Sequence, residues 1–207
     1  MMTLKKTILA YLRLSRLQTA AVTAVTPLIG SLLMGQRDIM VLSLLFLIGF
    51  FYHIYGFVLN EYIDVDVDRK SIDLQTKPLV SNQITKRSAI VLSLSAAACC
   101  CLLTLYFSPA IQPLALLLLA LLLGGIYDIL GKRIPGSDFI LGLSFFFMCL
   151  MGASTVSDTF TTVTYIVCSI YFIHIAQRRW RHDLEYASKT THYSLPDRSC
   201  FSPGRSK

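Results

Sequence analysis

Six long apolar segments constrain the fold of this chain more than any other feature. They cover about residues 17–34, 39–62, 88–107, 111–129, 139–155 and 160–176. Each is close to the ~20 residues (range ~17–25) that an α-helix needs to cross the hydrocarbon core of a bilayer. A segment in lipid must satisfy its own backbone hydrogen bonds, which favours helices. The sequence therefore predicts an all-α membrane protein with about six transmembrane helices.

The composition agrees with this class and limits the partners. Hydrophobic residues make up 54% of the chain and charged residues only 15%, whereas soluble domains carry about a quarter charged residues. The net charge of +7 would suit nucleic acid, but the basic residues stand at the ends of the apolar segments. That distribution favours anionic lipid headgroups. We therefore expect membrane lipids, and no nucleic acid, among the partners.

Residues 4–16 mix basic and apolar side chains and predict a short interfacial helix. A secretory signal peptide is the alternative reading. The apolar segment that follows is long enough to span the membrane and shows no convincing cleavage site. We take it as the first spanning helix, with Pro27 and Gly30 as kink positions.

The basic residues also predict the orientation. With six spans and the N-terminus inside, eighteen Lys and Arg residues fall on one side and only Arg37 falls on the other. This is a strong positive-inside bias. We expect the N-terminus, the connections 63–87 and 128–138, and the segment after residue 176 to be cytoplasmic.

Residues 60–69 read N-E-Y-I-D-V-D-V-D-R and place four carboxylates at the end of an apolar helix. If the helix continues, Asn60, Asp64 and Asp68 lie on one face, at i, i+4 and i+8. Such carboxylates repel one another and face the negative end of the helix dipole. Mg²⁺ removes both problems and accepts carboxylate, amide, water and phosphate oxygens. The alternative is a solvated acidic loop. Asp66 points away from this face and is expected to be solvated.

Three polar segments on the same side pair acids with bases. The first is the connection 63–87, whose second part reads T-K-P-L-V-S-N-Q-I-T-K-R. The other two read Y-D-I-L-G-K-R-I-P-G-S-D from residue 127 and Q-R-R-W-R-H-D-L-E-Y-A-S-K-T-T from residue 177. Acids in such segments would hold a metal, and Lys or Arg would hold phosphate. For any single cluster, basic residues that face lipid and set the topology are the alternative.

These motifs resemble those of the UbiA superfamily of intramembrane prenyltransferases. N-E-Y-I-D-V-D-V-D-R-K-S followed by K-P-L-V-S-N-Q-I-T resembles its first signature, N-x-x-x-D-x-x-x-D with a later basic residue before Pro-Leu. Y-D-I-L-G-K-R-I-P-G-S-D resembles the Tyr-to-Lys/Arg stretch between its fourth and fifth helices, and L-R-L-S-R resembles its opening. The resemblance covers roughly residues 7–191.

The resemblance implies part of a UbiA-type helical bundle that encloses a cavity. It implies Mg²⁺-dependent transfer of an isoprenyl group from an isoprenyl diphosphate to a lipid-soluble acceptor, in quinone-precursor or lipid biosynthesis. By position, the metal ligands would be Asn60, Asp64, Asp68 and Asp183, and the catalytic acids among them Asp64, Asp68 and Asp183. Substrate would be bound by Lys77, Lys132 and Arg133. Tyr127 would contact substrate or anchor the membrane interface.

Two departures from the family pattern stand at the C-terminal end. Ala187 occupies the position of the second Asp of the second motif, and about three further family helices have no counterpart. We expect an incomplete domain over residues 1–187 and a polar, disordered tail over 188–207. The alternative function is therefore a truncated, non-catalytic membrane or partner-binding relative, or one that needs a second copy of itself. A small cation channel or carrier ranks last, because acids in mid-membrane are missing.

Overall fold

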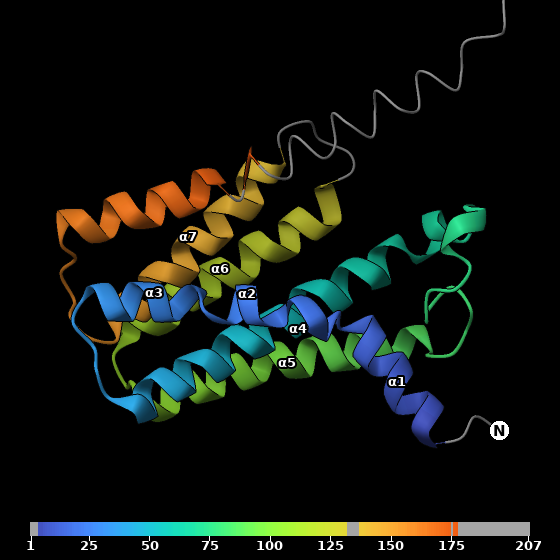
Figure 1. The fold of residues 1–207 in the computed structure, drawn as a ribbon, viewed down its shortest axis with the longest axis horizontal. Coiled ribbons are helices and arrows are strands. Elements are labelled where there is room, and N and C mark those ends of the chain that lie inside the picture. The colour runs from blue at the N-terminus through green and yellow to red at the C-terminus, as the bar shows by residue number, and fades with distance from the viewer. Residues whose placement is uncertain (1–3, 132–136, 175, 178–207) are drawn as a thin grey trace, which may run out of the picture.

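The computed structural model describes residues 4–131, 137–174 and 176–177, and these residues lie in helices, turns and loops, without a strand. Figure 1 shows the arrangement of the helices. In chain order they are α1 (Leu4–Leu14), η1 (Leu17–Thr19), α2 (Ala20–Ala24), α3 (Thr26–Leu33), α4 (Ile39–Asp68), η2 (Ile72–Leu74), α5 (Lys86–Phe107), α6 (Ile111–Leu130) and α7 (Asp138–Ser154). A further helix covers Thr162–His174. The predicted all-α class is confirmed.

Within the described residues, three of the six predicted spans have the length and composition of membrane-crossing helices. These are α4, α5 and α6. The other three segments form shorter apolar helices, at Leu17–Leu33, Asp138–Ser154 and Thr162–His174. The structure therefore supports a membrane protein with three candidate spanning helices among its described residues. Six spans stay a prediction.

The first predicted span is interrupted near its middle. α2 ends at Ala24 and α3 begins at Thr26, with Pro27 in its first turn. Proline has no N–H to continue a preceding helix but is well placed in a first turn, so a break just before Pro27 is expected. Gly30 has a different role from the predicted kink. A Cβ on Gly30 would overlap the carbonyl oxygen of Cys149 in α7, so this glycine lets α3 and α7 touch through their backbones.

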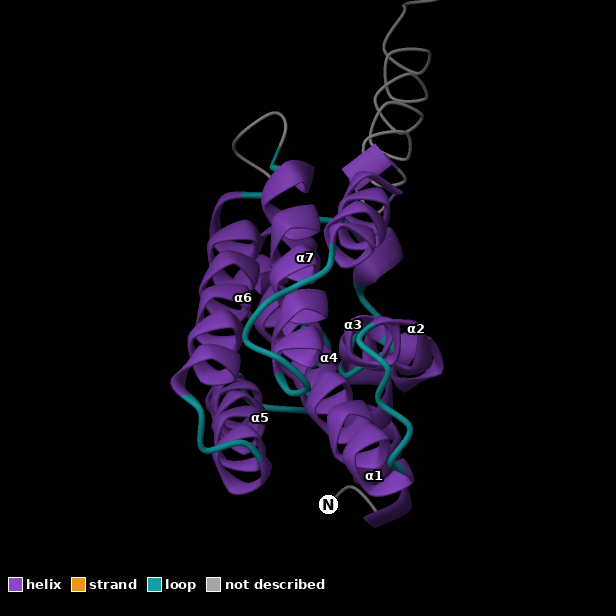
Figure 2. Cartoon of the chain, turned by 90° about the vertical axis from the view of Figure 1, so that its left-hand side faces the viewer, coloured by secondary structure: helices purple, strands orange, loops and turns teal. Residues whose placement is uncertain are grey.

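α4 is the centre of the bundle. In Figure 2, α5 and α6 lie on one side of it, and α2 and α3 lie on the other. Small residues of α5 face α4 at helical spacing and are buried: Ala89, Ser93, Ala96 and Cys100. The Ser93 hydroxyl donates to the carbonyl oxygen of Tyr55 at 2.9 Å. Small side chains of this kind allow close helix packing in membranes.

The end of α4 is held in place by a second, smaller apolar cluster. Its buried members come from α1, α4, the connection after α4 and the start of α5, and they are Ala10, Leu14, Val58, Val65, Leu79, Val80, Ile84 and Ala89. This cluster folds the connection back against α4 and brings α1 beside it. The ends of α4 and α6 and the beginnings of α5 and α7 point to one end of the bundle (Figure 1).

Candidate functional site

α4 continues through the acidic stretch as far as Asp68. Its last turns therefore carry Asp64 and Asp68 on one buried face, where their exposed fractions are 6% and 4%. Asn60, one turn earlier, is half-buried. The side chain of Asp66 is 70% exposed, as the helical period predicts. The structure thus brings together the acids that the i, i+4 spacing groups and turns Asp66 away from them.

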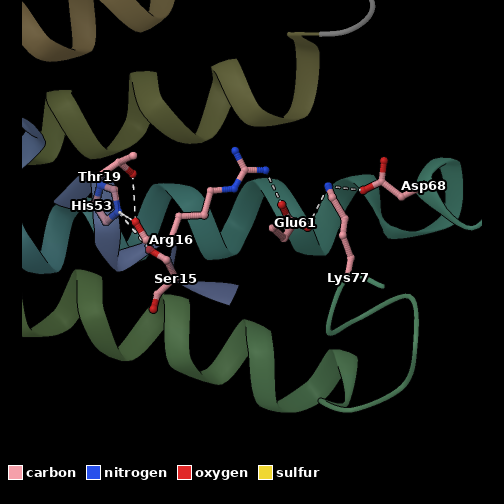
Figure 3. Close-up of polar contacts among 7 residues, drawn as sticks. All are labelled: Ser15, Arg16, Thr19, His53, Glu61, Asp68 and Lys77. Atoms are coloured by element: carbon pink, nitrogen blue, oxygen red, sulfur yellow. Dashed lines mark hydrogen bonds and ion pairs between the residues drawn. The ribbon is translucent and has the colours of Figure 1, made fainter. Parts of the chain in front are cut away.

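The connection after α4 returns a lysine to this face. Leu79, Val80 and Ile84 pack into the apolar cluster described above. Hydrogen bonds from the Ser81 amide and hydroxyl to the carbonyl oxygen of Lys77, at 2.9 and 2.8 Å, close the turn. The Lys77 ammonium group consequently lies between two carboxylates. Its Nζ is 2.8 Å from Asp68 Oδ2 and 3.1 Å from Glu61 Oε2 (Figure 3).

Glu61 also binds a cation from the N-terminal segment. Its Oε1 is 2.5 Å from Arg16 Nη2, and its exposed fraction is only 5%. One buried carboxylate thus bridges Arg16 and Lys77, and Lys77 continues the row to Asp68 (Figure 3). A buried carboxylate is costly unless it is paired and hydrogen-bonded. Two cations on two oxygens meet that condition.

These contacts fix the charge of Lys77. Burial acts to lower the pKa of Lys77, but the hydrogen bond to Asp68 and the negative charge of Glu61 outweigh it, so the pKa is raised. Lys77 is therefore a positively charged donor at the end of α4. Its side chain keeps 23% of its surface exposed, so a ligand can approach it.

Asp66 forms a separate ion-pair group on the outer side of α4. Lys86 Nζ lies 2.8 Å from its Oδ1, and Arg69 Nη1 lies 3.6 Å away. The predicted solvation of Asp66 is confirmed, with these two basic partners in addition.

The other predicted site residues lie partly outside the described residues. Tyr127 is buried near the end of α6. Lys132, Arg133 and Asp183 lie outside the described residues, and so do Ala187 and the segment 188–207. Their predicted roles therefore stay predictions.

The described residues fit a magnesium ion whose coordination shell is completed by water and a phosphate. Among them, no three His, Cys, Asp or Glu side chains are grouped closely enough to hold a metal alone. Mg²⁺ does not require such a cage, because it usually takes one or two protein carboxylates and completes its shell with water and substrate phosphate. Asp64 and Asp68 on one face, with Asn60 one turn earlier on the same helix, supply that kind of donor set.

Comparison with known proteins identifies the family. A profile of the UbiA prenyltransferase family matches residues 21–200. The chain belongs to this family. The resemblance inferred from the sequence motifs is thereby confirmed.

Two curated relatives of this UbiA family member are 4-hydroxybenzoate octaprenyltransferases from Francisella tularensis subsp. tularensis, strains FSC 198 and SCHU S4 / Schu 4. Each is 27% identical over 143 residues, which are 69% of this chain and 46% of the relative. The chain therefore spans about half the length of the curated relatives it matches.

Solved structures confirm the UbiA-type helical fold. A structure of digeranylgeranylglyceryl phosphate synthase in membranes has a TM-score of 0.68 and 24% identity, and the match covers 84% of this chain and 60% of that one. A UbiA homologue from Archaeoglobus fulgidus bound to GPP and Mg²⁺ has a TM-score of 0.63 at 20% identity, over 81% and 60% of the two chains. The apo UbiA homologue from Aeropyrum pernix K1 has a TM-score of 0.63 at 18% identity, over 77% and 59%.

Two residues of this site, Arg16 and Glu61, were not predicted from the sequence. A signal for Glu61 was present, because it stands seven residues, about two helical turns, before Asp68 and therefore on the same side of α4. Arg16 ends the L-R-L-S-R stretch that resembles the family's opening, but no local pattern pairs it with Glu61, which is 45 residues away.

Proposed function

We propose that this UbiA family member acts in the Mg²⁺-dependent transfer of an isoprenyl group from an isoprenyl diphosphate to a lipid-soluble acceptor. The observation that carries the proposal is the pairing at the end of α4. Two buried carboxylates, Asp64 and Asp68, share one face, and Lys77 touches Asp68 at 2.8 Å. Carboxylates that suit Mg²⁺ beside a cation that suits phosphate are what a magnesium-bound diphosphate requires.

The side chains divide the work of binding between them. Asn60, Asp64 and Asp68, with Asp183 by family position, would hold the metal, and Mg²⁺ when bound would neutralise charge on the departing diphosphate. Lys77 would donate to a phosphate oxygen, and Lys132 and Arg133 would add positive charge. Tyr127 would contact the substrate. An apolar surrounding would keep water from the carbon that loses the diphosphate.

An aromatic precursor of a quinone is the acceptor class that the relatives favour. The curated relatives are 4-hydroxybenzoate octaprenyltransferases. The A. fulgidus homologue binds GPP and Mg²⁺, which supports the donor and the metal. A glycerol-phosphate lipid is the other acceptor class to test, because a solved relative is a digeranylgeranylglyceryl phosphate synthase.

The test uses the whole chain, purified in nanodiscs, with geranyl diphosphate and either 4-hydroxybenzoate or a glycerol-phosphate lipid. We expect diphosphate release and a prenylated product with Mg²⁺ present, and loss of both when EDTA removes the metal. Binding of the diphosphate without release would favour the non-catalytic alternative. If the chain neither binds the diphosphate nor releases it, the proposal is contradicted.

A further inference from the structure

Arg16 joins α1 to η1 with an unusual backbone. Its φ and ψ are 45° and 46°, in the left-handed region. Residues other than glycine seldom adopt this conformation, and surrounding contacts must hold them in it. The conformation ends α1 and turns the chain alongside α4, so it fixes where the Arg16 side chain starts.

His53 of α4 provides the holding contacts. Its Nε2 lies 3.0 Å from the carbonyl oxygen of Ser15 and 3.2 Å from that of Arg16 (Figure 3). A carbonyl oxygen only accepts, so Nε2 carries the proton and donates, and Nδ1 accepts from the Thr23 hydroxyl at 3.1 Å. His53 is 1% exposed. It acts as a buried clamp on the backbone at Arg16.

From this clamp the Arg16 side chain runs along α4 toward the acids. Its guanidinium carbon lies 5.4 Å from the ring centre of Phe57, a cation–π distance. Its Nη2 then reaches Glu61 at 2.5 Å. His53, Phe57 and Glu61 are spaced four residues apart, so they lie on one face of the helix. Three successive contacts therefore direct one arginine to the mouth of the proposed diphosphate site.

We infer that Arg16 is a further diphosphate-binding residue and that Glu61 is the positioning residue that holds Arg16 and Lys77 as a pair of cations. This inference rests on the proposed function. Glu61 touches both cations, through Oε1 and Oε2. A guanidinium has five N–H donors, so the contact with Glu61 leaves donors for a second anion. The Arg16 side chain is 38% exposed, which gives that anion access.

The four ion-paired side chains from Arg16 to Asp68 carry charges that suit an incoming anion. Arg16 and Lys77 carry two positive charges, and Glu61 and Asp68 carry two negative ones. If Asp68 contributes to a metal site, Lys77 and Arg16 are left with Glu61 alone and have an excess positive charge. Phosphate binds arginine through directed, charge-assisted hydrogen bonds, which depend on the guanidinium being in position.

A double-mutant cycle separates a positioning role from simple competition. The measurement is the affinity of the purified chain in nanodiscs for geranyl thiolodiphosphate, an analogue that reacts poorly, with Mg²⁺ present. Arg16→Gln should weaken binding about tenfold, because one charge-assisted contact is lost. In a Glu61→Gln background the same substitution should cost less than about threefold, because Arg16 is no longer held in place. If Glu61 merely competed with the ligand, Arg16→Gln would cost more in that background.

Arg13→Gln is the matched control, because Arg13 is an exposed basic residue of α1, and it should leave the affinity unchanged. Thermal unfolding of each variant tests for a structural role, which would lower the unfolding temperature without changing the affinity of the folded protein. If Arg16→Gln does not fold, Arg16→Lys replaces it in the cycle, since lysine keeps the positive charge but lacks the paired N–H donors of the guanidinium group.

The outcomes are distinct. If the original chain does not bind the analogue, the proposed function fails and this inference falls with it. If the chain binds but Arg16→Gln binds equally well, only the role of Arg16 is overturned. Equal losses in both backgrounds overturn the positioning role of Glu61.

Discussion

Asp64 and Asp66 differ sharply although they are two residues apart on α4. Asp64 is 6% exposed and shares a face with Asp68, whereas Asp66 projects outward toward Lys86. We predict that Asp64→Asn weakens the Mg²⁺-dependent binding of a prenyl diphosphate analogue by at least about tenfold, because a metal ligand loses its charge. Asp66→Asn is the matched control and should change the affinity by less than about twofold.

Isothermal titration with and without Mg²⁺ measures this difference. The two variants are isosteric with their parent side chains, so a difference between them reports position on the helix. Equal effects of Asp64→Asn and Asp66→Asn would show that the helical face does not select the metal ligands.

At the scale of secondary-structure elements, α3 and α7 depend on two glycines for their contact. A Cβ on Gly30 would overlap the carbonyl oxygen of Cys149, and a Cβ on Gly152 would overlap that of Pro27. We predict that Gly152→Ala destabilises the protein by about 1–3 kcal/mol, because backbone atoms must move apart to accommodate the methyl group. Gly56→Ala in α4 is the matched control, since a Cβ there meets nothing within 4 Å.

Thermal unfolding in one detergent compares the two alanine variants. Gly56→Ala should be neutral or stabilising by up to about 1 kcal/mol, because alanine favours the helix. A Gly152→Ala protein as stable as the Gly56→Ala protein would mean that α3 and α7 are not in close contact.

The elements differ in how far the sequence alone predicts them. α5, α6 and α7 begin and end within about two residues of the expected bounds, because long apolar runs define membrane helices. The shared face of Asp64 and Asp68 follows from the helical period. The contacts of Glu61 with Arg16 and Lys77 do not, because they depend on how α1 and the connection after α4 pack. Pro27 indicated the break before α3. The packing role of Gly30 could not be predicted, because it depends on the contact with Cys149 of α7.

For the whole molecule, the polar ends of the helices have a consistent arrangement. The acidic end of α4 and the end of α6 lie at one end of the bundle (Figure 1). The connection between α3 and α4, which carries Arg37, lies at the other end of α4. Since eighteen of the nineteen Lys and Arg residues fall on the side of the acidic stretch in the predicted topology, the positive-inside rule favours a cytoplasmic site.

This orientation is tested by labelling single cysteines in intact cells with a membrane-impermeant maleimide. The probes are Arg37→Cys and Thr76→Cys, at two exposed positions, in a chain whose native cysteines are replaced by serine or alanine. We expect labelling at position 37 from outside and labelling at position 76 only after the membrane is opened. Both probes lie in water-exposed connections, so a difference between them reports the side of the membrane and not burial in the protein. Labelling of both from outside, or of position 76 alone, would place the row from Arg16 to Asp68 away from the cytoplasm. The site would then face a compartment where a cytosolic pool of prenyl diphosphate has no direct access.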